Sequence, residues 1–279
     1  MVCYAITCFV PMWFALLMGA KYLAQQLPAC HTALYYPLCM AVMVLWPMFL
    51  WPATHGMPDA FGLTFAAVIA LLCADYRFET LPWPRLLAIF AATFALILTR
   101  RWYMFWILAF YAVYVLAVLV GAVRRKTLGS TLKHMLLFGI PSAVIIVGAL
   151  LPTFKTILTT DYADIYGAYY GGGFGNNCLG QLRTQGLIWL VLCAAGLVWL
   201  LYCRSTRAQA IVAAAASLGA MVLFTRTQSL GDHQSLILAP FYLLMLFGLC
   251  AKLTQQKAKP WLRNAAAGVL AVFLVVNFG

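Results

Sequence analysis

The acidic residues of this chain are few, and their positions could support chemistry. Only six of its 279 residues are Asp or Glu. Four of the six, Asp59, Asp161, Asp164 and Asp232, fall in polar segments that come after an even-numbered apolar segment, namely the second, sixth or eighth. If the apolar segments cross a membrane, these loops open on one side of it. A carboxylate there could act as the general base for group transfer to a hydroxyl, so we expect a site on that side.

A second polar segment supplies groups that could bind phosphate. Residues 224–235 read Phe-Thr-Arg-Thr-Gln-Ser-Leu-Gly-Asp-His-Gln-Ser between two apolar segments. The guanidinium of Arg226 suits a phosphate, Gln228 adds an amide, and His233 could donate a proton or accept one. Alternatively, the loop is solvated, with Arg226 reaching the lipid headgroups and Asp232 capping a helix.

Two further arginines lie in a tight turn between apolar segments, where residues 99–103 read Thr-Arg-Arg-Trp-Tyr. Arg100 and Arg101 would bind a lipid phosphate, with Tyr103 beside them as a further substrate contact. Alternatively, the pair anchors a helical hairpin to headgroups, with Trp102 and Tyr103 in the aromatic belt. A different span count would place the turn on the cytoplasmic side.

The longest loop, residues 155–185, combines Asp161 and Asp164 with four tyrosines and a run of three glycines. Aromatic faces beside carboxylates are typical of carbohydrate or lipid-headgroup sites, so Asp161 is a candidate catalytic base. Asp161 and Asp164 together could hold a divalent metal. An amphipathic interfacial helix with a flexible glycine tail is the alternative. Asp59 could bring a second catalytic carboxylate to the same face, or it could be a helix N-cap.

The elements that must position these residues are membrane helices. Hydrophobic residues make up 65% of the chain, charged residues 9%, and the mean hydropathy is +0.94. Such a composition predicts an all-α polytopic membrane bundle in a single domain over residues 1–279. We expect about ten spans, at residues 2–20, 31–51, 61–73, 86–98, 102–123, 135–154, 187–203, 208–224, 236–251 and 265–278.

Loop charge predicts the orientation. In the ten-span arrangement, the odd-numbered loops hold 13 of the 18 Lys and Arg residues, which places them in the cytoplasm and the N-terminus outside. Among them, Arg77 and Arg85 are expected to pair with Asp75 and Glu79. The formal charge of +12 is then ordinary membrane topology, with no nucleic-acid partner. No P-loop, dinucleotide fingerprint or metal-ligand cluster occurs in the sequence, so we expect no ATP-driven transport by this chain alone.

Several of these segments together resemble a family. They are residues 57–62 (Met-Pro-Asp-Ala-Phe-Gly), 99–103, 161–163 (Asp-Tyr-Ala) and 226–233, the last preceding a span that contains a proline. In these segments the chain resembles polytopic bacterial glycosyltransferases of GT-C type, related to protein mannosyltransferases and lipid A aminoarabinose transferases.

The resemblance implies a polyprenyl phosphate-linked sugar donor and sugar transfer to an envelope acceptor. It implies a bacterial inner membrane, with the site on the periplasmic or extracellular side. Such enzymes carry the catalytic carboxylate in a large first outer loop, whereas no acid precedes Asp59 here. We therefore expect this chain to be the later part of a longer module, without that first span and loop.

Two other functions fit the same residues. A transporter or flippase of an anionic lipid or polysaccharide precursor would use the arginines as a pathway, with ionisable groups at mid-depth. A non-catalytic membrane assembly partner requires only the apolar spans.

Overall fold

The structure, a computed structural model, describes residues 2–28, 30–46, 59–100, 102–152, 155–156, 173–226, 230–231, 234–255, 260–261, 264 and 268. Within these residues the chain is helical, and the β-type pairing is one isolated bridge between Cys30 and Gln255. The predicted all-α class is confirmed.

Ten α-helices and two short 3₁₀ helices are described. They are α1 (Val2–Gln26), α2 (Thr32–Leu45), α4 (Asp59–Leu72), η1 (Phe78–Thr80), α5 (Trp83–Thr99), α6 (Tyr103–Arg125), α7 (Leu128–Ala149), α10 (Phe174–Gln185), α11 (Leu187–Tyr202), α12 (Arg207–Thr225), η3 (Gln234–Ile237) and α13 (Ala239–Leu253).

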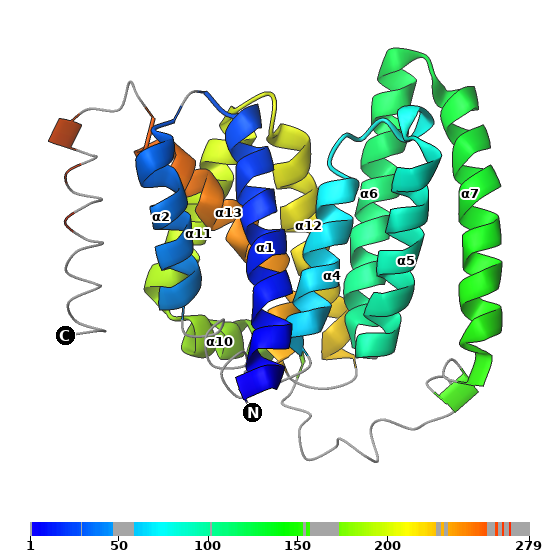
Figure 1. Cartoon of the computed structure of the whole chain (residues 1–279), viewed down its shortest axis with the longest axis horizontal. Helices are drawn as coiled ribbons and strands as arrows, with labels where there is room; N and C mark the ends of the chain where they lie inside the picture. Colours follow the sequence, from blue (N-terminus) through cyan, green and yellow to red (C-terminus); the bar gives the residue numbers. More distant parts are fainter. Residues whose placement is uncertain are drawn as a thin grey trace.

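Most of the long helices stand side by side and run up and down, so that the loops gather at two ends of the bundle (Figure 1). One end carries the start of α4, the α5–α6 turn, η3 and the crosswise helix α10, and we call it the α10 end. The opposite end carries η1 and the α6–α7 and α11–α12 turns, and we call it the η1 end. The N-terminus lies at the α10 end.

Local sequence explains several helix boundaries. Helix α10 begins after Gly173 and ends at Gly186, whose φ angles of 91° and 80° lie in the left-handed region that favours glycine. Gly186 also separates α10 from α11, and the two helices meet at 101°. Prolines occupy the first turns of α5 and α13, where the missing N–H is tolerated.

The predicted number of about ten spans is not confirmed. Four described helices are long and apolar enough to cross a membrane: Ile6–Gln26 within α1, and α6, α7 and α12. The bent pair α10 and α11 would make a fifth. Helices α2, α4, α5 and α13 are apolar but have 14, 14, 17 and 15 residues, fewer than the roughly 20 that a span needs. The predicted span at residues 265–278 lies largely outside the described residues.

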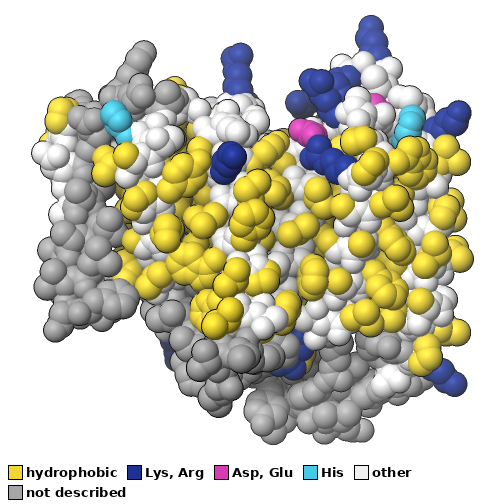
Figure 2. Space-filling view, in the orientation of Figure 1, with side chains coloured by type: hydrophobic (Ala, Val, Ile, Leu, Met, Phe, Trp, Pro, Cys, Tyr) yellow, Lys and Arg dark blue, Asp and Glu magenta, His cyan; other side chains and the backbone are white. Residues whose placement is uncertain are grey.

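Burial explains why the short helices looked like spans. Helix α13 is packed among other helices and buries ten of its fifteen residues, while α4 buries seven of fourteen. A helix that is apolar on all sides can be surrounded by protein instead of lipid. In α7, by contrast, Thr131 is the buried residue, and large apolar side chains such as Leu136, Ile140 and Val144 are exposed. Apolar residues cover much of the bundle's side, which is consistent with a membrane protein (Figure 2).

The described basic residues are distributed unevenly between the two ends. The elements that carry Arg100, Lys155, Arg183 and Arg226 lie toward the α10 end: they are the α5–α6 turn, the residues just after α7, α10 itself and the end of α12 (Figure 1). The η1 end carries Lys21, Arg77, Arg85, Arg124, Arg125, Lys126, Lys133, Arg204, Arg207 and Lys252. The described basic residues of the odd-numbered loops therefore lie at one end of the bundle.

Candidate functional site

The structure places four of the eight predicted site residues. Asp59, Arg100, Tyr103 and Arg226 are described, whereas Asp161, Arg101, Gln228 and His233 lie outside the described residues. Asp164, the other predicted metal ligand, also lies outside them.

Three of the four described residues come together at the α10 end. Asp59 is the first residue of α4, and its side chain is 1% exposed. One carboxylate oxygen accepts a hydrogen bond from the indole nitrogen of Trp102 at 2.9 Å, and the other lies 3.3 Å from Nη2 of Arg100. The hydroxyl of Tyr103 donates to the backbone oxygen of Asp59 at 2.9 Å. We call these four residues the Asp59 cluster.

The local sequence lets these segments approach closely. Gly62 lies one turn after Asp59, and a Cβ atom there would stand 2.1 Å from Cε2 of the Tyr103 ring. The short α5–α6 turn holds Arg100 in an extended conformation, and its guanidinium carbon lies 4.7 Å from the centroid of the Trp102 ring. Arg100 is therefore held by a carboxylate and an aromatic face together.

This geometry changes the interpretation of two predicted residues. We expected a lipid phosphate as the counter-charge of Arg100 and Arg101, but Arg100 pairs with Asp59. Asp59 was predicted either as a base or as a helix cap, and its carboxylate contacts the α5–α6 turn. The Arg100 side chain is 29% exposed, so part of its guanidinium is open to a ligand. Its Nε, by contrast, is buried and has no hydrogen-bond partner among the described residues.

A row of buried amides on α10 forms a second polar group at the same end. Asn177, Gln181 and Gln185 follow one another at intervals of four residues and are each less than 5% exposed. The Asn177 amide nitrogen donates to the hydroxyl of Thr225 at 2.8 Å, and its oxygen accepts from the backbone N–H of Leu230 at 2.7 Å. Asn177 thus ties α10 to the segment that follows α12.

The other two amides extend these contacts. Gln181 donates to the hydroxyl of Ser235 at 2.8 Å, and Gln185 accepts from the indole nitrogen of Trp46 at 2.6 Å. The sequence interpretation missed this row because residues 155–185 were read as one loop. The spacing of the amides on one helical face is the signal that could have found it.

Arg226 is the sequence neighbour of Thr225, which Asn177 contacts, but it is not paired with the amide row. It directly follows Thr225 at the end of α12, is exposed, and forms no ion pair within the described part of the chain. It remains a cation available to a ligand.

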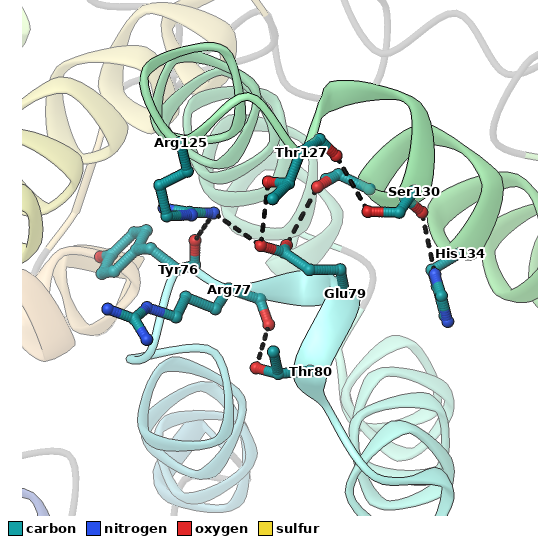
Figure 3. Close-up of polar contacts among 9 residues, drawn as sticks. Tyr76, Arg77, Glu79, Thr80, Arg125, Thr127, Ser130 and His134 are labelled. Atoms are coloured by element: carbon teal, nitrogen blue, oxygen red, sulfur yellow. Dashed lines mark hydrogen bonds and ion pairs between the residues drawn. The ribbon is translucent and has the colours of Figure 1, made fainter.

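The η1 end carries a separate network of charges (Figure 3). Asp75 pairs with Arg85 as predicted. The prediction for Glu79 was wrong, because Glu79 accepts from Nη2 of Arg125 at 3.1 Å and from the hydroxyls of Thr127 and Thr131 at 3.2 and 3.0 Å.

The carboxylate form of Glu79 is stabilised by these donors. Burial alone would raise the pKa of Glu79, but hydrogen bonds from its own backbone N–H, from Thr131 and from Arg125 outweigh it, and the pKa is lowered. In Figure 3 the side chain of Arg77 points away from Glu79. This network joins η1 to the α6–α7 turn and fixes the upper part of α7.

Neither end offers a described metal site. Within the described ranges, no group of three or more His, Cys, Asp or Glu residues could hold a metal ion. Comparisons of the chain with protein-family models, curated proteins and solved structures found no match. The function must therefore be argued from the residues themselves.

Proposed function

We propose that this protein binds a polyprenyl phosphate-linked sugar at the α10 end and transfers the sugar to a hydroxyl of an envelope acceptor. The observation that supports the proposal is the contact between Asp59 and Arg100. A carboxylate and a guanidinium from two hairpins meet at the α10 end, and Arg226 at the end of α12 lies toward the same end of the bundle. A transferase needs a base for the acceptor and a cation for the departing phosphate.

The proposed step uses each group once. The acceptor oxygen bonds to the anomeric carbon of the sugar while the bond from that carbon to the phosphate oxygen breaks. The proton of the acceptor hydroxyl passes to the carboxylate of Asp59, and the negative charge that develops on the polyprenyl phosphate is stabilised by Arg100.

Donor binding would also make Asp59 accessible. The carboxylate is 1% exposed, and Arg100 is one of the groups that cover it. A donor phosphate competes with Asp59 for Arg100, since both are anions suited to the guanidinium fork. As Arg100 turns to the phosphate, the carboxylate becomes free to accept a proton.

Loop charge supports the sidedness. Because most basic loop residues are expected in the cytoplasm, we propose that the α10 end faces the periplasmic or extracellular side of a bacterial inner membrane. Cysteine-accessibility labelling at Arg183 and Arg204, which lie at opposite ends, would test this placement.

Donor binding can be tested with matched arginine variants. The purified chain in detergent would be titrated with a polyprenyl phosphate sugar, comparing Arg100→Gln and Arg226→Gln with Arg183→Gln. Arg183 is an exposed cation at the same end and outside the Asp59 cluster. We expect roughly a tenfold or greater weakening for Arg100→Gln, a weakening for Arg226→Gln and little change for Arg183→Gln. Equal affinity in all four proteins would contradict the proposal.

The 101° break between α10 and α11 favours a second candidate, a transporter of an anionic lipid. Transporters often bind their substrates at discontinuous helices, and the buried amides of α10 lie beside this break. A transporter would move a labelled lipid across a vesicle membrane without an acceptor, whereas a transferase would require one.

A further inference from the structure

An apolar groove separates α7 from α5 and α6. It has a volume of about 410 Å³. Helix α7 lines it with one stripe that includes Met135, Gly139, Ser142 and Ile146. From Met135 to Val147 this stripe is about 18 Å long at the usual helical rise, which is more than half the thickness of a bilayer's hydrocarbon core.

The groove favours a hydrocarbon ligand. Its polar side chains include Thr93 and Tyr111, but their hydroxyl oxygens lie 2.6 Å apart in a hydrogen bond, and Thr93 also donates to the backbone oxygen of Ile89. The hydroxyls of Thr93 and Tyr111 therefore already have partners, whereas that of Tyr114, which also lines the groove, is buried with no hydrogen-bond partner among the described residues. An empty groove of this size beside lipid would lose dispersion contacts along both walls, and a flexible chain would restore them.

The position of α7 makes the groove accessible from the side. Its attachment to the bundle includes the Glu79 network at the η1 end and a contact between Phe78 and Phe138, whose ring centroids are 6.1 Å apart. Below that contact α7 stands apart from its neighbours in Figure 1. Much of its remaining surface is exposed and apolar.

Charge indicates the end at which the head of the ligand lies. The α6–α7 turn and the first turns of α7 carry Arg124, Lys126 and Lys133, all exposed and without an ion-pair partner among the described residues. Lys and Arg side chains gather above this corner of the bundle in Figure 2.

The acids that the structure describes near each end are already paired. At the η1 end, Asp75 and Glu79 are paired with Arg85 and Arg125. At the α10 end, by contrast, Arg100 is neutralised by Asp59. Arg183 and Arg226 at the α10 end are also exposed, but they lie on α10 and at the end of α12, which do not line the groove. The unpaired positive charge next to the groove thus lies at the η1 end.

We propose that this groove binds one acyl chain of an anionic phospholipid, with the phosphate of that lipid against Arg124, Lys126 and Lys133. The site lies at the opposite end from the Asp59 cluster and goes beyond the proposed sugar transfer. It would use the attraction of basic juxtamembrane residues for anionic lipids together with a shaped apolar groove.

Photocrosslinking tests the acyl-chain part of the proposal. The full chain would be reconstituted in phosphatidylcholine vesicles that contain phosphatidylglycerol with a diazirine on its acyl chain. Gly139→Phe would place a ring in the groove, and Gly148→Phe is the matched control on the same helix outside the lining. A Cβ at either glycine meets no atom within 4 Å. We expect labelling of α5, α6 and α7 to fall several-fold in Gly139→Phe and to stay unchanged in Gly148→Phe.

A charge variant tests the headgroup part without touching the groove. The double variant Arg124→Gln and Lys133→Gln should lower the preference for phosphatidylglycerol over a phosphatidylcholine analogue by roughly 30-fold at low salt. Lys21→Gln with Arg204→Gln removes two exposed cations at the same end and should leave that preference unchanged.

Three results would overturn the proposal. The first is equal labelling of Gly139→Phe and the unaltered chain. The second is equal labelling of the unaltered chain by the phosphatidylglycerol and phosphatidylcholine analogues. The third is loss of labelling when unlabelled polyprenyl phosphate is added. The last would identify polyprenyl phosphate as the occupant. The assay contains no sugar donor, so its failure would leave the proposed transfer untouched.

Discussion

Gly62 of α4 lies directly against the ring of Tyr103 at the start of α6. A Cβ atom on Gly62 would be 2.1 Å from Cε2 of that ring, and Tyr103 is fully buried. The Tyr103 hydroxyl also donates a hydrogen bond to the backbone oxygen of Asp59, which leaves the ring little freedom to move away. The contact therefore sets the spacing between the two hairpins of the Asp59 cluster.

Gly62→Ala should destabilise the protein by about 1–3 kcal/mol through overpacking of a buried site. Gly148→Ala, where a Cβ meets nothing within 4 Å, should be neutral or slightly stabilising. Thermal unfolding in detergent, followed by circular dichroism, would compare the two. Equal melting temperatures would mean that α4 and α6 can separate at no cost.

Glu79→Gln should loosen the attachment of α7 to η1. The substitution keeps the size of the side chain but replaces the carboxylate that accepts hydrogen bonds from Arg125 and Thr131. The free energy of unfolding should fall by roughly 1–3 kcal/mol. Hydrogen exchange at the backbone of residues 128–135 should quicken. Asp75→Asn is the control, because Asp75 pairs with Arg85 outside this network and is 46% exposed.

The same carboxylate predicts a pH dependence. Because the folded-state pKa of Glu79 is lowered, its contribution to stability is fully present above the unfolded pKa of about 4.3. The contribution is lost as the pH falls through the lower folded-state value. The difference in melting temperature between the unaltered chain and Glu79→Gln should therefore be largest near neutral pH and shrink under acid. A difference that persisted at the lowest pH would contradict this.

Asn177→Ala should release the segment after α12 from α10. The change removes the acceptor of the Leu230 backbone N–H, and an unpaired buried N–H costs about 1–3 kcal/mol. The Thr225 hydroxyl loses the amide that donates to it but still donates to the backbone oxygen of Met221. The Leu230 amide should exchange faster with solvent. Leu179→Ala, at an exposed position of the same helix, should leave that amide protected, and equal exchange in both variants would exclude the proposed role of Asn177.

The sequence predicts where the helices lie in the chain better than it predicts whether protein surrounds each helix. The apolar segment at residues 187–203 became Leu187–Tyr202, and the segment at 102–123 became Tyr103–Arg125. Hydrophobic length marks such elements directly. It does not distinguish a helix with an exposed apolar surface, such as α7, from one buried within the protein, such as α13, so the span count is not confirmed.

The predicted site shows that a local sequence pattern identifies candidate residues but not the contacts between them. Asp59 and Arg100 were both singled out, yet their contact spans 41 positions and depends on how two hairpins pack. Segment order alone does not determine helix packing in a membrane. For the same reason Glu79 was assigned to a nearby arginine, whereas Arg125 reaches it from the end of α6.

The most direct test of the proposed function is sugar transfer by Asp59→Asn. The unaltered chain, Asp59→Asn and the control Asp75→Asn would be reconstituted with a radiolabelled polyprenyl phosphate sugar and extracted envelope acceptors. Asparagine can still accept from Trp102 but is a far weaker base than a carboxylate. We predict transfer by the unaltered chain and by Asp75→Asn, and a loss of roughly 100-fold or more in Asp59→Asn with donor binding retained. Undiminished transfer by Asp59→Asn, or no transfer by the unaltered chain, would contradict the account.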